Sequence, residues 1–81
     1  MTKTTAKKYA AIIADLNAKL DAISPSLEFE STDLSRAAWF ARCDIEDAEE
    51  AMASGNTKAA RRALKSADWH TWEANLARGA S

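Results

Sequence analysis

The sequence predicts an all-α fold, a three-helix antiparallel bundle with helices over residues 4–23, 33–53 and 57–78. Each stretch carries apolar residues at alternating intervals of four and three, the spacing of one face of an α-helix. Pro25 interrupts this pattern once and Gly55 interrupts it again. With only 81 residues in the chain, we expect residues 1–81 to form a single helical domain.

The first predicted helix, residues 4–23, has an apolar face and a charged face. Its apolar face is formed by Tyr9, Ile13, Leu16, Leu20 and Ile23, with Ile12 beside them. This spacing suits both a helix of an antiparallel bundle and a parallel dimeric coiled coil, and about three heptads favour the bundle. Pro25 ends the helix because it disfavours the α conformation at Ser24 and has no backbone N–H.

The second predicted helix, residues 33–53, follows a capping sequence and has an alanine-rich apolar face. Thr32 is one of the N-cap candidates, and Asp33 would lie at the positive end of the helix dipole. The apolar face is formed by Leu34, Ala38, Ala41, Ile45, Ala48 and Met52, flanked by Ala37, Phe40 and Ala51. Before this helix, we expect Leu27 and Phe29 to cover one end of the bundle; an exposed docking loop is the alternative.

A short turn joins the second and third predicted helices. Gly55 fits the left-handed position after a helix, and Asn56 or Thr57 fits the cap of the next one. So short a connection makes the two helices antiparallel neighbours. Acidic residues crowd the end of the second helix, namely Asp44, Glu46, Asp47, Glu49 and Glu50, and basic residues crowd the start of the third, namely Lys58, Arg61, Arg62 and Lys65. We expect the two clusters to face each other, with exposed pairs contributing about 0–1 kcal/mol each.

The third predicted helix, residues 57–78, has two unlike faces. One face is small and apolar and is formed by Ala60, Leu64, Ala67, Thr71 and Ala74, flanked by Ala59, Ala63 and Ala77. The other face carries basic residues followed by large apolar ones: Lys58, Arg61, Arg62, Lys65, Trp69, Trp72 and Leu76. A helix with two such faces must contact two neighbours, or one neighbour and a binding partner.

Residues 55–67, GNTKAARRALKSA, resemble the inter-helix turn and second helix of a tetratricopeptide-type unit. Gly55 and Asn56 match the turn, and the small-large-small helix positions are matched by Ala60, Leu64 and Ala67. The chain departs from that family's tryptophan, leucine and proline positions, which here are Asp44, Asp47 and Trp72. We interpret the resemblance as shared hairpin packing rather than membership, and it assigns no binding residue.

Composition and charge argue against several classes of protein. The net charge is −1, so no global field draws the chain to nucleic acid or to an anionic membrane. The single cysteine, Cys43, allows no internal disulfide, which favours a reducing compartment. Neither a secretory signal nor an apolar stretch of the ~20 residues that span a bilayer is present. We therefore expect a cytoplasmic protein without a membrane segment.

The sequence offers little catalytic or metal-binding chemistry. His70 is the only histidine, and we expect it to be partly buried and bonded to a neighbouring helix. Cys43, Asp68 and Glu73 lack the paired spacings of zinc ligands, and an inert thiol is the expected state of Cys43. Two glycines are too few for a phosphate-binding loop. We expect no enzymatic activity, no metal site and no cofactor.

The three tryptophans have two interpretations. Trp39 lies roughly 140° round the second helix from its apolar face, where a third helix would have to cover it. Trp69, Trp72 and Leu76 form a stripe that core packing on the first helix would explain. The contacts would be with Tyr9, Ile12 and Ile13 or, in a regular up-down-up bundle, with Leu16, Leu20 and Ile23. Core packing is the simpler interpretation in both cases. Tryptophans that no helix covers are instead the side chains most often found as binding anchors.

We predict a small non-enzymatic protein-interaction module: an adaptor, regulator or inhibitor that docks on a larger protein. The predicted binding residues are Trp39, Trp69, Trp72 and Leu76, with steering charges from Arg61, Arg62 and Lys65. One alternative is a nucleic-acid-binding accessory protein that uses Lys7, Lys8, Lys58, Arg61, Arg62 and Lys65, although the slightly acidic chain argues against it. Another is a structural homo-oligomer, since so small and alanine-rich a core is completed readily by homodimerisation.

Overall fold

The computed structural model describes residues 1–23 and 32–80, and this part of the chain forms three helices without a β-strand. They are α1 (Lys3–Ile23), α2 (Asp33–Ala53) and α3 (Thr57–Ala80). The predicted three-helix bundle is confirmed, with boundaries that differ by at most two residues from those expected. The expectation for Leu27 and Phe29 falls on residues outside those described.

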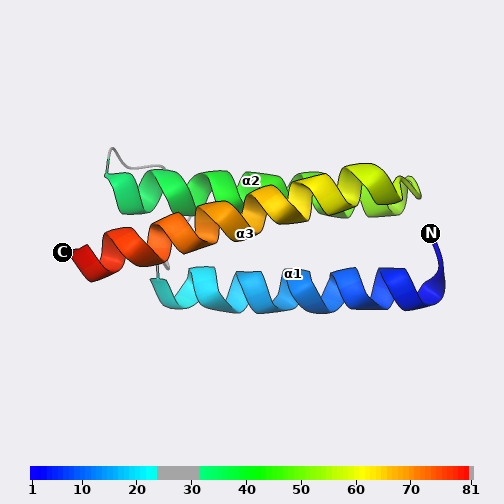
Figure 1. Cartoon of the computed structure of the whole chain (residues 1–81), viewed down its shortest axis with the longest axis horizontal. Coiled ribbons are helices and arrows are strands. Elements are labelled where there is room, and N and C mark those ends of the chain that lie inside the picture. The colour runs from blue at the N-terminus through cyan, green and yellow to red at the C-terminus, as the bar shows by residue number, and fades with distance from the viewer. Residues whose placement is uncertain (24–31, 81) are drawn as a thin grey trace.

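The helices form an elongated bundle of 41 × 17 × 17 Å. Figure 1 shows α2 and α3 as an antiparallel pair, with α1 lying beside them and running in the same direction as α3. Contacts are most extensive between α2 and α3, and α1 contacts α3 more extensively than α2. The fold is therefore a tight α2–α3 hairpin against which α1 packs.

Local hydrogen bonds explain why α2 ends and α3 begins where they do. Gly55 has a φ of 74°, the left-handed conformation that glycine adopts most easily. The Gly55 N–H donates to the Met52 carbonyl at 3.1 Å, and the Asn56 N–H donates to the Ala51 carbonyl at 2.8 Å, which together make a Schellman motif. Asn56 Oδ1 then accepts from the Ala59 N–H at 3.1 Å. Asn56 therefore closes α2 and caps α3.

The core between α2 and α3 is built largely from alanine. Six alanines have at most 1% of their surface exposed: Ala38, Ala41 and Ala48 on α2, and Ala60, Ala67 and Ala74 on α3. Small side chains let two helix backbones approach closely. Larger buried residues come from α1, namely Tyr9, Ile13, Leu16 and Leu20, together with Ile45 of α2 and Leu64 of α3. The predicted small face of the third helix is thus the face that enters the core.

Within residues 1–23 and 32–80, the chain contains no helix with the length and apolar character needed to cross a membrane.

Candidate protein-docking surface

Five large apolar side chains of α2 and α3 are exposed at the surface. The exposed fraction is 39% for Trp39, 41% for Phe40, 57% for Trp69, 51% for Trp72 and 53% for Leu76. The core-packing interpretation of the tryptophans is therefore wrong. Because the alanine face of α3 packs on α2, the opposite side of the helix is turned toward solvent. We call these five residues the apolar patch.

The members of the apolar patch contact one another in pairs. The rings of Trp69 and Trp72 have centroids 5.0 Å apart and an interplanar angle of 31°. Trp39 and Phe40 pack edge to face at 5.4 Å. A groove of about 470 Å³ lies between the first half of α2 and the second half of α3, and its apolar lining includes Phe40, Trp69, Trp72 and Leu76. The patch is thus a connected surface that extends over two helices.

Phe40 belongs to this surface, but the sequence assigned it only to the flank of the apolar face of the second helix. Its ring also lies 5.6 Å from that of His70 on α3. Its position next to Trp39 in the chain was the available signal, since consecutive aromatic residues on a helix cannot both point into one core. Helical periodicity alone did not identify it as a surface residue.

Six of the exposed residues of α3 form a continuous stripe that runs along the helix. Its members are all exposed and follow one another at intervals of four and three: Lys58, Arg62, Lys65, Trp69, Trp72 and Leu76. We call these six residues the outer stripe. Its first half is cationic and its second half is apolar. The eighteen residue steps from Lys58 to Leu76 extend over about 27 Å of α-helix.

Arg61 does not belong to the outer stripe, although the sequence grouped it with the other basic residues. Its side chain turns toward α1, where Nε donates to the Tyr9 hydroxyl at 3.5 Å. Arg61 also lines a groove of about 700 Å³ between α1 and the first half of α3. Of the predicted steering residues, Arg62 and Lys65 therefore belong to the outer stripe and Arg61 does not, although Lys65 also lines the groove that Arg61 lines.

The acidic cluster of α2 and the basic cluster of α3 do not form the expected ion pairs. Among the described residues, no carboxylate lies within 4.0 Å of the charged groups of Lys58, Arg62 or Lys65. The Lys and Arg ion pairs of the described residues involve other side chains, such as Lys19 with Asp15 at 3.0 Å on α1. Within residues 1–23 and 32–80, the cationic half of the outer stripe consequently has no ion-pair partner.

A small polar cluster joins α3 to α2 beside the apolar patch. The Ser66 hydroxyl donates to Asp44 Oδ2 at 2.7 Å, and His70 Nδ1 lies 2.8 Å from the same oxygen. The predicted partly buried histidine bonded to a neighbouring helix is thus confirmed. In a serine-histidine-aspartate triad the serine and the carboxylate bond to opposite ring nitrogens, whereas here both lie on the Nδ1 side. The cluster ties the helices together without activating the serine.

Cys43 lies half-buried on α2 among acidic residues. Burial raises the pKa of its thiol above the ordinary value, and the charges of Glu46, Asp47 and Asp44 raise it further. Since the thiolate is the reactive form, this environment makes the thiol a weak nucleophile at neutral pH.

In the described part of the chain, no three His, Cys, Asp or Glu side chains are placed to hold a metal ion.

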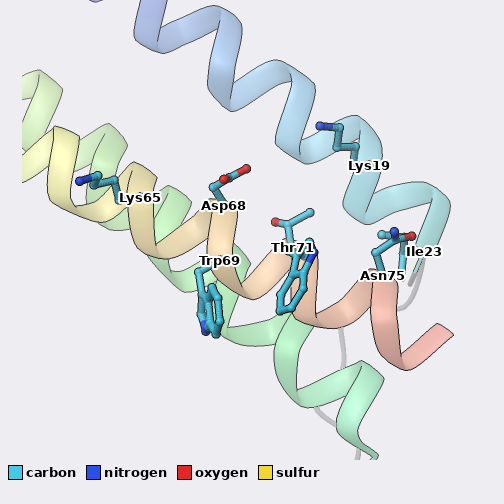
Figure 2. Close-up of a pocket in the computed structure, with 8 residues that line it drawn as sticks. Lys19, Ile23, Lys65, Asp68, Trp69, Thr71 and Asn75 are labelled. Carbon is cyan, nitrogen blue, oxygen red and sulfur yellow. The ribbon is translucent and has the colours of Figure 1, made fainter. Parts of the chain in front are cut away.

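A second groove, of about 680 Å³, lies between α1 and the second half of α3. Figure 2 shows Lys19 and Ile23 on α1 across from Thr71 and Asn75 on α3. In the same view, the Trp69 indole extends from α3 in the direction away from α1. The tryptophan side chains therefore border this groove without being covered by α1.

Comparison of the chain with protein-family models, with curated proteins and with solved structures finds no match.

Proposed function

We propose that this protein is a small non-enzymatic interaction module that docks on a larger protein through the apolar patch, as an adaptor, regulator or inhibitor. The observation that carries the proposal is the exposure of three tryptophans, a phenylalanine and a leucine on adjoining surfaces of α2 and α3. Tryptophan is the residue type most enriched among binding anchors.

The extent of the apolar patch supports this proposal. Since burying an aromatic side chain removes about 150–250 Å² from water, the exposed parts of the five residues amount to roughly 400–500 Å². This is roughly a tenth of the 5422 Å² accessible surface, close to the share that a standard protein–protein interface takes from a small protein. Apolar patches of this extent on monomers are often functional.

The arrangement of the rings favours a protein partner over a nucleic acid. Trp69 and Trp72 pack against each other, so no base can enter between them. The groove beside them is completed by Phe40 and Leu76, and a leucine offers no stacking surface to a base. The net charge of −1 gives nucleic acid no long-range attraction.

The test is affinity capture from the native host with the wild-type chain and with Trp72→Ala, followed by measurement of Kd for the purified partner. We expect Trp72→Ala to weaken the complex by about 30-fold, the effect of losing roughly 2 kcal/mol at a binding anchor. Its free energy of unfolding should change by less than about 1 kcal/mol because the side chain is half exposed.

A matched control is Asn17→Ala, which truncates an exposed side chain of α1 far from the apolar patch in sequence. This variant should bind the partner like the wild type. Equal capture of the same proteins by all three baits would contradict the proposal.

A further inference from the structure

We propose that the outer stripe binds an amphipathic α-helix of the partner whose contact face is apolar in one half and acidic in the other. This inference rests on the proposed function and specifies the chemistry of the partner. It follows from two properties of the outer stripe. The first is its spacing along α3, and the second is the change along its length from cations, which have no ion-pair partner among the described residues, to exposed aromatic residues.

The spacing of the outer stripe is that of a helix-packing face. Positions at alternating intervals of four and three lie on one side of a helix, so the six side chains form a straight ridge against which a second helix can pack along its length. The inner face of α3, from Ala60 to Ala74, shows the same intervals and packs against α2. A length of about 27 Å matches five turns of a partner helix.

The cationic half of the outer stripe determines the charge of the partner. Lys58 lies in the first turn of α3, where the helix dipole makes positive charge unfavourable, and Arg62 and Lys65 add two more positive charges in the following two turns. No acidic side chain of the described residues lies within 4.0 Å to offset this cost. Acidic side chains on a bound helix would supply the missing counter-charges, and complementary charges of this kind select partners and accelerate association.

A second copy of α3 offers the cations of the outer stripe no ion-pair partner, although antiparallel packing would bring them to aromatic rings. If two copies of α3 packed in parallel, the three cations of one would face the three cations of the other. If they packed antiparallel along the whole stripe, the cationic half of each would face the apolar half of its partner. Neither arrangement provides the acidic side chains that the cations lack.

The inference is tested with synthetic helical peptides of about 21 residues that contain no tryptophan. Their contact positions carry leucine in one half and glutamate in the other, in both orders along the chain, and matched peptides carry lysine in place of glutamate. Binding is followed by the tryptophan fluorescence of the full chain at low salt, to which Trp39, Trp69 and Trp72 all contribute. We expect one of the glutamate peptides to bind at least about 10-fold more tightly than its lysine counterpart.

Charge reversal provides the decisive variant. Arg62→Glu/Lys65→Glu should reverse the preference, so that a lysine peptide binds more tightly than its glutamate counterpart. Both side chains are exposed and glutamate has a helix propensity close to that of arginine and lysine, so this variant should fold. The matched control is Lys3→Glu/Lys7→Glu, the same change of charge on exposed residues of α1, which should keep the wild-type preference.

The other outcomes overturn the inference in distinguishable ways. Equal binding of glutamate and lysine peptides would refute the claim that half of the partner's contact face is acidic, and the proposed function would stand. If no peptide binds at 1 mM but Trp72→Ala still weakens the capture of a partner, the helical partner is refuted and the proposed function also stands. Self-association lost in Trp72→Ala would identify a second copy as the occupant. Tighter binding of a 20-nucleotide poly-dT strand than of any peptide would overturn both the inference and the proposed function.

Discussion

The two long faces of α3 have the same residue spacing, but one is buried and the other is exposed to solvent. The inner face, from Ala60 to Ala74, is buried against α2 and α1, whereas the outer stripe, from Lys58 to Leu76, is exposed along its whole length. The inner face has small residues and one leucine, and the outer stripe has two tryptophans. The more hydrophobic residues of the second half of α3 therefore lie outside the core.

The difference shows that side-chain size, rather than hydrophobicity, determines which face of α3 packs on α2. Alanines on both helices allow a close approach that tryptophan would prevent. Each alanine buries little area, so the stability gained per residue is modest. The large apolar residues left on the outer stripe are then available for a partner.

The largest expected effect comes from making the same substitution on the two faces. Leu64→Ala removes a side chain that is only 6% exposed and should lower the free energy of unfolding by about 2–5 kcal/mol. Leu76→Ala removes one that is 53% exposed and should change it by less than about 1 kcal/mol. Urea unfolding followed by circular dichroism measures both. Similar losses from the two variants would refute the contrast between the faces.

An intermediate effect is expected at the turn that holds the inner face in place. Gly55→Ala forces a side chain into the left-handed conformation and should cost roughly 1–2 kcal/mol of stability. The added Cβ meets no other atom within 4 Å, so the cost is conformational. Gly55→Asn is the control, because asparagine tolerates this conformation better. Thermal unfolding should rank glycine above asparagine and asparagine above alanine, and an alanine variant as stable as the wild type would refute this account.

The smallest expected effect concerns Cys43 on α2. Its side chain is half-buried, so it is more exposed than the inner face of α3 and less exposed than the outer stripe. Burial and neighbouring carboxylates raise its pKa, so iodoacetamide at pH 8 should alkylate the folded chain more slowly than the chain in urea. Glu46→Gln/Asp47→Asn should increase the folded rate by roughly twofold, since two repulsive charges are removed. Equal rates in the folded and unfolded chains would contradict the raised pKa.

The sign of the linked effect on stability follows from the direction of this shift. A thiol pKa that is higher in the folded chain than in the unfolded chain favours folding while the thiol is protonated. This contribution is fully present below the unfolded value of about 8.5 and is lost as the pH rises through the higher folded value. A Cys43→Ser variant, which lacks the thiol, should show less of this alkaline loss.

The sequence was sufficient to predict the three helices because local signals mark each boundary. Pro25 follows the end of α1, Thr32 accepts a hydrogen bond from the Ser35 N–H at the start of α2, and Gly55 separates α2 from α3. The apolar spacing also identified the buried face of every helix correctly. These features depend on neighbours within a few residues, which a sequence displays directly.

Whether Trp69 and Trp72 are buried or exposed could not be predicted because it depends on where α1 lies. α1 packs near Leu64 and Arg61, on one side of α3, and leaves Trp69 and Trp72 uncovered. Periodicity describes the faces of a helix without stating how many of them have neighbours. The expected ion pairs between the acidic and basic clusters could not be predicted for a similar reason, because exposed side chains on adjacent helices need not approach within 4.0 Å.

Asn56 completes the end of one helix and the start of the next, so no spacer separates α2 from α3. Closing so short a chain segment costs little entropy, and the alanine faces on either side can meet early in folding. The first helix, whose contacts with the hairpin are fewer, would then dock last and leave first. Amide hydrogen exchange would accordingly be fastest in α1. The hairpin that presents the tryptophans would then stay folded when α1 detaches from it.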